Sequence, residues 1–225
     1  MFPIRDTITY HGAKLGTFGL LILNGLAFLY QYSLGEESLY QSFYAFGFIP
    51  SHFFADIPGE FHTIFTSMFV HASLGHLLSN LWFLWVFGPA IEGRVGFLRF
   101  VILYLLSGIA AAFLQGFSMP ESIVPMVGAS GAVSGVLGAY LVLFPKARVL
   151  TVIPPLIFFF FWVRAPIYLG YWILIQFAYA FFEIPGVAWW AHIGGFALGL
   201  TVVLFMRPKR NYRADPYWEC LNDYC

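Results

Sequence analysis

Long apolar stretches separated by short polar ones run through almost the whole chain. A helix that crosses a bilayer needs roughly 20 mostly apolar residues, and six stretches approach that length. These stretches are residues 16–33, 76–92, 97–117, 130–144, 166–182 and 190–206. The pattern predicts an all-α membrane protein, a bundle of six transmembrane helices in a single domain over residues 1–225, with its core at about 16–206.

Two other apolar segments do not fit as spans. Residues 149–163 (VLTVIPPLIFFFFWV) contain Pro154 and Pro155, which remove two backbone donors and disfavour a continuous helix. We expect this segment to lie along the membrane interface or dip into it. The first loop, residues 34–75, is long and rich in aromatic residues, which favour the interface. We predict that this loop lies outside the cell and is partly embedded in the membrane.

Composition supports lipid as the main solvent. The chain has 225 residues, of which 60% are hydrophobic and only 10% are charged, whereas a soluble domain has about 25% charged residues. A water-soluble domain is therefore excluded, and nothing indicates nucleic-acid binding. The two cysteines, Cys220 and Cys225, lie in the polar tail and are expected to be free thiols.

The basic residues define an orientation for the six spans. With six spans, all eleven Lys and Arg residues fall on the side that holds both termini, and none falls in the opposite loops. Cytoplasmic loops carry the excess of Lys and Arg, so both termini are predicted to be cytoplasmic. The basic residues are Arg5, Lys14, Arg94, Arg99, Lys146, Arg148, Arg164, Arg207, Lys209, Arg210 and Arg213.

One serine in the predicted spans lies in an unusual setting. Ser130 stands between Gly128 and Gly131 in MVGASGAVSG, at the external end of the fourth span. Small neighbours leave its hydroxyl accessible and let other backbone approach closely. A serine needs a base within hydrogen-bond reach to act as a nucleophile. Alternatively, Ser130 is a residue that packs between helices, which is how we interpret Ser107, Gln176 and Thr201.

A histidine at the same predicted depth supplies a candidate base. His192 in AHIGGFALGL begins the sixth span on the external side. Gly131 and Gly135 on the fourth span, and Gly195 and Gly199 on the sixth, form small-xxx-small patterns that let helices pack closely. Close packing of these two spans is what would bring the imidazole to the hydroxyl. A satisfied interface histidine is the structural alternative.

A third polar group lies in HLLSN at the start of the second span. His76 and Asn80 are four residues apart, so a helix puts both on one face, and both can donate hydrogen bonds. Such donors could stabilise an oxyanion, although the pair could also bridge two helices. A metal site formed by His71, His76 and His192 is a further alternative, but no carboxylate accompanies them at ligand-like spacing. We therefore expect neither a metal nor another cofactor.

Together these motifs resemble the rhomboid family of intramembrane serine proteases. HLLSN, GASG and AHIGG occur in this order on spans two, four and six, and residues 65–96 resemble the family's second span and following turn. The resemblance covers about residues 60–200. It implies a helical bundle with a water-accessible cavity opening outward and a Ser–His dyad without an acidic third member.

The resemblance also implies roles for individual residues. Ser130 corresponds to the nucleophile, His192 to the general base, and His76 and Asn80 to the oxyanion donors. Substrates would be single-span membrane proteins, cut in or beside their transmembrane helix after entering laterally near spans two and five. Residues 181–190 would form the loop over the site, where Pro185-Gly186 favours a turn.

Two positions depart from the family pattern. Many rhomboids carry Trp-Arg where this chain has Phe61-His62, and many have an aromatic residue that stacks on the base where this chain has Ser134. Neither change removes a reacting group, but the second leaves open what orients His192. Without a carboxylate to fix its tautomer, the imidazole should depend on packing for its orientation.

Other functions are weighed against proteolysis. A non-catalytic rhomboid-like protein would bind transmembrane helices without cutting them, but such relatives generally lack the serine or the histidine. A transporter or channel should show broken helices or repeats around a charged site at mid-depth, which the sequence lacks. The resemblance favours the plasma (inner) membrane of a prokaryote, with the site facing outward. Oligomeric state and substrate identity are left open.

Overall fold

Six long helices form the body of the protein. The computed structural model describes residues 1–9, 14–153 and 156–206, so the tail cysteines Cys220 and Cys225 lie outside the described residues. Each long helix begins and ends within three residues of a predicted span. The six helices are α1 (Leu15–Ser33), α6 (Leu74–Val95), α7 (Phe97–Ser118), α8 (Ser130–Leu143), α9 (Ala165–Phe181) and α10 (Trp189–Phe205).

The six helices differ in length. Helices α1, α6 and α7 are long and apolar enough to cross a membrane, with 19, 22 and 22 residues. Helices α8, α9 and α10 are also apolar but have only 14, 17 and 17 residues. Length and composition therefore identify three span candidates in the described part of the chain, and the prediction of six spans is not established by this criterion.

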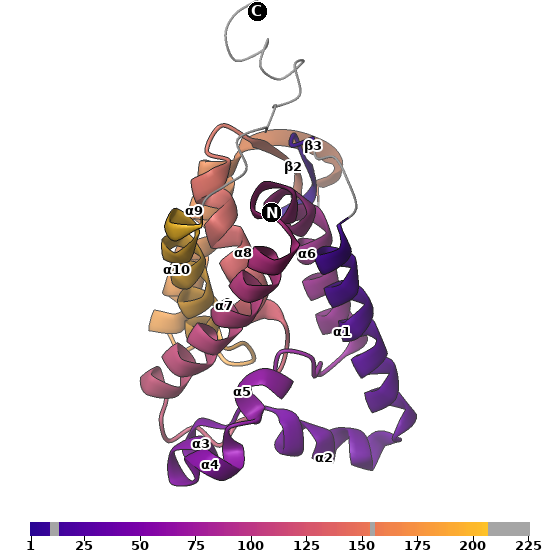
Figure 1. Cartoon of the computed structure of the whole chain (residues 1–225), viewed down its shortest axis with the longest axis vertical. Coiled ribbons are helices and arrows are strands. Elements are labelled where there is room, and N and C mark those ends of the chain that lie inside the picture. The colour runs from indigo at the N-terminus through magenta and orange to yellow at the C-terminus, as the bar shows by residue number, and fades with distance from the viewer. Residues whose placement is uncertain (10–13, 154–155, 207–225) are drawn as a thin grey trace, which may run out of the picture.

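Helix α8 lies inside the bundle, in contact with α6, α7, α9 and α10 (Figure 1). Residues 131–140 are all buried. Its contact with α10 is made by backbone: a Cβ added at Gly195 would overlap the carbonyl oxygen of Gly131, and one added at Gly199 would overlap that of Gly135. Only glycine at these positions lets the two helices approach so closely.

The prediction of an all-α protein is wrong in one respect, because the chain also forms a three-stranded antiparallel sheet. The strands are paired in the order β1-β2-β3, with Phe2 opposite Val152 and Arg148 opposite Arg164. Segment 149–163 is rich in β-branched and aromatic residues, which favour strands, and two prolines separate its halves. The strands are β1 (Phe2–Asp6), β2 (Arg148–Ile153) and β3 (Leu156–Arg164).

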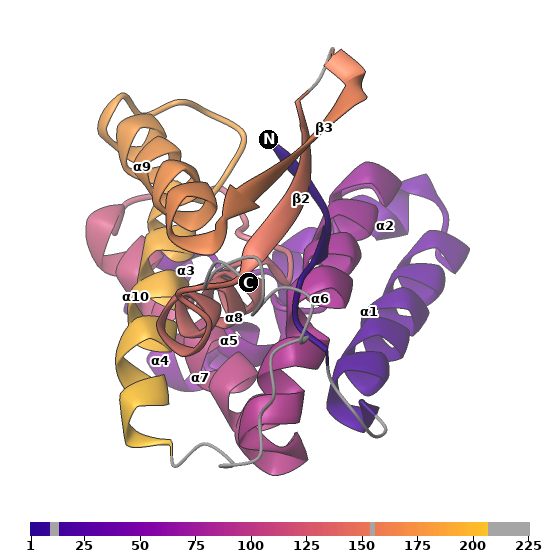
Figure 2. The ribbon, with the colours of Figure 1, turned by 90° about the horizontal axis from the view of Figure 1, so that it is seen from above.

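The sheet lies at one end of the bundle, and the β2–β3 hairpin projects sideways past the helices (Figure 2). Phe159 and Phe160 are more than half exposed there, and the Arg5 guanidinium lies 5.5 Å from the ring centre of Trp162. The expectation that segment 149–163 is not a continuous helix is confirmed. Its position at the membrane interface stays a prediction, as does immersion of the first loop.

The first loop folds into four short helices at the end opposite the sheet (Figure 1). His62 joins two of them, since its ring nitrogens lie 3.0 Å from the carbonyl oxygen of Gly59 and 3.1 Å from that of Ala45. In the place where many rhomboids carry arginine, this chain therefore has a side chain that bridges two backbone segments. The short helices are α2 (Glu36–Phe46), α3 (Pro50–Ala55), α4 (Ile57–Glu60) and α5 (Thr63–Thr66).

Helix α1 is held at each of its ends by a polar contact. The buried carboxylate of Glu92 on α6 accepts hydrogen bonds from the backbone N–H groups of Gly16 (2.9 Å) and Thr17 (2.8 Å). At the other end, the amide oxygen of Gln31 accepts from the backbone N–H of His71 at 3.0 Å. Both contacts connect α1 to segments that lead into the candidate site.

Candidate active site

Ser130 is the first residue of α8, and the turn before it fits only glycine. Gly128 has a φ of +118°, a conformation that residues with a side chain rarely adopt. A Cβ added there would lie 2.6 Å from His76 Nε2 and 3.4 Å from the Asn80 amide nitrogen. The structure therefore brings together the serine motif and both predicted oxyanion residues.

The start of α6 determines where His76 and Asn80 lie. The Ser73 hydroxyl caps the helix by accepting a hydrogen bond from the backbone N–H of His76 at 3.1 Å. Asn80 follows one turn later and is 6% exposed. Within the described part of the chain, its amide nitrogen has no hydrogen-bond partner. A buried donor without a partner costs about 1–3 kcal/mol, so this N–H is available to a ligand.

His71 supports the backbone just before Ser130. Its Nε2 accepts a hydrogen bond from the N–H of Ala129 at 3.4 Å, and its Nδ1 lies 3.2 Å from the carbonyl oxygen of Phe69. The ring meets that of His76 edge-on, with centroids 5.2 Å apart. Burial, and secondarily the neighbouring His76, lower the pKa of His71 to about 4. His71 is therefore neutral near pH 7, as acceptance at Nε2 requires.

His192 lies in α10 and is held on three sides. Its Nδ1 lies 2.7 Å from the amide oxygen of Gln176 on α9. The Trp172 ring packs beside the imidazole, with centroids 5.9 Å apart and an interplanar angle of 31°, and the Trp189 ring meets it edge-on at 6.0 Å and 88°. His192 itself is 9% exposed. Two tryptophans therefore flank the imidazole, where the aromatic residue expected on α8 is missing.

Ser134 stands where that aromatic residue was expected, and its side chain bonds to the backbone of its own helix. Its hydroxyl donates to the backbone carbonyl of Ser130 at 2.6 Å. This bond back along the helix is common for serine and turns the side chain toward its own backbone. The aromatic contact with His192 that Ser134 cannot make is made by Trp172 of α9 and Trp189 of α10.

Facing backbone on α8 and α10 brings the residue after Ser130 close to the residue before His192. A Cβ added at Gly131 would lie 3.7 Å from the carbonyl oxygen of Ala191, the residue before His192. Among the described residues, no hydrogen bond joins the Ser130 hydroxyl to the His192 ring. Catalytic hydrogen bonds are often long in a substrate-free site, so the arrangement remains compatible with a dyad.

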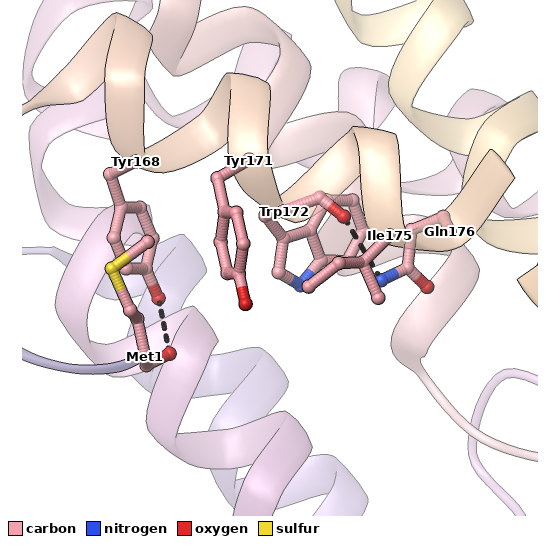
Figure 3. Close-up of a pocket in the computed structure, with 6 residues that line it drawn as sticks. All are labelled: Met1, Tyr168, Tyr171, Trp172, Ile175 and Gln176. Atoms are coloured by element: carbon pink, nitrogen blue, oxygen red, sulfur yellow. Dashed lines mark hydrogen bonds between the residues drawn. The ribbon is translucent and has the colours of Figure 1, made fainter. Parts of the chain in front are cut away.

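A cavity of about 70 Å³ runs along α9 and ends at Gln176 (Figure 3). The side chains of α9 point into it in the close-up, and the N-terminal Met1 closes its other end. Ser130, His192, His76 and Asn80 do not line this cavity. Its lining residues are Met1, Tyr168, Tyr171, Trp172, Ile175 and Gln176.

Several residues at the site were not predicted from the sequence. Gln176 was interpreted as a packing residue, Trp172 and Trp189 were given no role, and His71 was considered only as a metal ligand. A buried glutamine in a span is a detectable signal, but its partner on another helix is not visible in a single sequence. Among the described residues, no group of three or more His, Cys, Asp and Glu side chains could hold a metal ion.

Comparison with known proteins agrees with the resemblance seen in the motifs. The family model described as Rhomboid domain matches residues 58–209. RHOMBOID-like protein 2 of Arabidopsis thaliana is 34% identical over 162 residues, which are 68% of this chain and 45% of that protein. RHOMBOID-like protein 6, mitochondrial, of the same plant is 31% identical over 151 residues, 66% of this chain and 45% of that protein.

A bacterial relative carries the name of an enzyme. Rhomboid protease GluP of Bacillus subtilis is 31% identical over 131 residues, 58% of this chain and 25% of that protein. The chain thus matches less than half the length of each of these three relatives. The residues matched by the family model include all of α6 to α10, which carry the candidate site. This chain belongs to the rhomboid family.

Proposed function

We propose that this chain is a serine endopeptidase that hydrolyses peptide bonds in or beside the transmembrane helices of membrane proteins. The observation that carries the proposal is the buried Asn80 amide nitrogen, which has no hydrogen-bond partner among the described residues and lies with His76 against Gly128, two residues from Ser130. A donor kept without a partner at that position suits a negative charge that develops only during reaction. A helix-binding protein without activity would have no use for it.

The proposed reaction uses Ser130 as nucleophile and His192 as base. The Ser130 oxygen attacks the substrate carbonyl carbon while its proton passes to His192 Nε2. The resulting oxyanion accepts hydrogen bonds from Asn80, His76 and the backbone N–H of Ser130. The C–N bond then breaks, the amine leaves with the proton from His192, and an ester to Ser130 remains. His192 then takes a proton from a water molecule, whose oxygen attacks the ester carbonyl carbon. The bond to the Ser130 oxygen breaks, His192 returns the proton to that oxygen, and the acyl product leaves as a carboxylic acid.

The length of α8 supports a site below the membrane surface. Its 14 residues extend about 21 Å at 1.5 Å per residue, whereas the hydrocarbon core is about 30 Å thick. A helix enclosed by other helices can be this short without exposing its ends to lipid. If its cytoplasmic end lies at the inner boundary, Ser130 lies roughly 9 Å below the outer one.

We also propose six spans, with both termini in the cytoplasm and the site opening outward. The distribution of Lys and Arg supports this orientation, and the apolar character of α8, α9 and α10 supports the count. Single-span proteins and the surrounding lipid are the proposed partners. We further propose a location in a prokaryotic plasma membrane. The relatives that match this chain include bacterial proteins and plant proteins with mitochondrial and chloroplastic names.

The proposal is tested by cleavage of a single-span reporter in liposomes. The purified chain should cut the reporter, and both Ser130→Ala and His192→Ala should be silent while keeping the thermal stability of the native protein. Crosslinking of the reporter to Ser130→Ala should still succeed, because binding does not need the hydroxyl. A native chain that binds several reporters and cuts none would instead favour the non-catalytic, helix-binding alternative.

A further inference from the structure

We infer that Gln176 is a positioning residue that holds His192 in the tautomer required of a base. This inference rests on the proposed function and adds to the dyad a third member from α9. The contact on which it depends joins His192 Nδ1 and the Gln176 amide oxygen over 2.7 Å. Both side chains are buried, at 9% and 5% exposure, so bulk solvent has little access to this bond.

The neighbouring hydrogen bond fixes which end of the amide faces the ring. The Gln176 amide nitrogen donates to the backbone carbonyl of Trp172 at 3.2 Å. Only the NH₂ end can donate to a carbonyl, so the oxygen faces His192. An amide oxygen only accepts, which means that Nδ1 of the imidazole carries the hydrogen. Nε2 is then left with its lone pair, as proton removal from Ser130 requires.

The α9 helix adds orientation to this choice of tautomer. Trp172 lies one turn before Gln176, and its ring packs beside the same imidazole, tilted by 31° at a centroid distance of 5.9 Å. The tryptophan contact and the amide hydrogen bond therefore both restrict how the imidazole can turn. In the Ser-His-Asp proteases a carboxylate performs both tasks. A neutral amide does so without bringing a charge into the membrane, where ionised side chains are costly.

Gln115 on α7 offers a matched control. Its amide oxygen accepts a hydrogen bond from the backbone N–H of Ala191 at 3.3 Å, and the residue is 8% exposed. It is thus a second buried glutamine bound to α10 beside His192, but it contacts backbone and not the ring. Gln115→Leu and Gln176→Leu remove the same chemical group at similar burial, and only the second removes a partner of the imidazole.

The first experiment measures reporter cleavage in liposomes for both leucine variants and for Gln176→Glu, which keeps an acceptor. We expect Gln176→Leu to lower kcat by about 10- to 100-fold with KM within about twofold of the native value. Gln115→Leu should keep kcat within about threefold at a similar loss of thermal stability, and Gln176→Glu should recover most of the rate. Equal kcat values for the two leucine variants would overturn the inference.

The second experiment reads the tautomer without any substrate. Ring ¹⁵N chemical shifts of the histidine-labelled protein, with His192 assigned by its loss in His192→Ala, should show a protonated Nδ1 and a bare Nε2. Gln176→Leu should show a mixture of tautomers. A native ring protonated at Nε2 would refute the inference, whether or not the protein cuts any reporter. Failure of cleavage alone would count against the protease, while this spectrum would still decide the role of Gln176.

Discussion

Helix α10 has two neighbours that hold it in different ways. Against α8 the contact is backbone on backbone, with Gly131 and Gly135 facing Gly195 and Gly199. Against α9 the contact is made by side chains, through one amide and one tryptophan on His192. The first contact determines how far apart the serine and histidine helices lie. The second determines how the imidazole is turned and protonated.

The difference indicates which parts of the site tolerate change. A backbone contact has no rotamers to adjust, so any added atom must separate the helices. A side-chain contact can be replaced by another side chain of similar shape and chemistry. Ser134 occupies the position where the family resemblance leads us to expect an aromatic residue, and Trp172 on α9 supplies a ring beside His192 instead. Gly195→Ala and Trp172→Ala test this contrast directly, and Asn80→Ala and Asp6→Asn extend the test to the rest of the site and to the far end of α8.

The largest effect is expected from Gly195→Ala, which adds one methyl group to the α8–α10 contact. The new Cβ would overlap the Gly131 carbonyl oxygen. Overpacking of this kind costs about 1–3 kcal/mol, or roughly 3–10 °C of Tm for a chain of this size. Displacement of the dyad by even about 1 Å should reduce cleavage by about 100-fold or more. Thermal unfolding and reporter cleavage measure the two effects.

Gly170→Ala on α9 is the matched control for that substitution. No atom lies within 4 Å of a Cβ added at Gly170 among the described residues. Alanine should therefore leave cleavage unchanged and raise Tm slightly, because it stabilises a helix by about 0.5–1 kcal/mol relative to glycine. If both alanine variants behaved alike, the backbone contact would have no special place in the site.

The next largest effect is expected from Asn80→Ala. Removal of one oxyanion donor should lower kcat by about 100-fold. Thermal stability should stay constant or rise, because the deleted amide nitrogen is buried without a partner in the described chain. Measured together, cleavage and Tm separate this residue from a packing asparagine, whose loss would lower Tm and leave kcat nearly constant.

A smaller effect is expected from Trp172→Ala, which removes one of the rings beside the imidazole. We expect cleavage to fall by about 10-fold, because an aromatic contact contributes about 0.5–1.5 kcal/mol beyond its buried area. Trp172→Phe should restore most of the rate, since a smaller ring still stacks. Failure of phenylalanine to rescue would show that the indole, and not stacking in general, is needed on α9.

The smallest effect on cleavage is expected at the far end of α8, where Tyr140 donates a hydrogen bond of 2.7 Å to Asp6 of β1. Burial raises the pKa of Asp6 from 3.8 to about 6. Between these pH values the folded protein binds more protons than the unfolded chain, so this group favours folding as pH falls from 6 toward 4 and disfavours it above 6. Asp6→Asn should therefore raise stability by about 1–3 kcal/mol at pH 8.

Thermal unfolding at two pH values tests that prediction. The advantage of Asp6→Asn should shrink between pH 8 and pH 5, because the native carboxyl becomes protonated in the folded protein over that range. Cleavage at pH 8 should be unaffected. A variant less stable than the native protein at pH 8 would mean that the ionised carboxylate stabilises the fold.

Much of the fold was predictable because helices in a membrane depend on local composition. The apolar stretches gave all six long helices within three residues, and the motif HLLSN brought His76 and Asn80 to one face of α6. The β1–β2 pair was missed because it joins residues about 150 positions apart, and such pairing leaves no periodic signal in a single sequence. The β2–β3 hairpin is local, but its apolar run was interpreted as an interfacial segment. Gln176 was misread for a related reason, since its partner lies on a different helix.

Glu92 has a consequence for the order in which the chain is made. Its carboxylate completes the first turn of α1, yet it follows Thr17 by 75 residues. In the bilayer an unpaired backbone N–H is costly, and the group that caps the first turn of α1 exists only once the end of α6 has been synthesised. Helix α1 lies outside the residues matched by the family model, but one of those residues caps it.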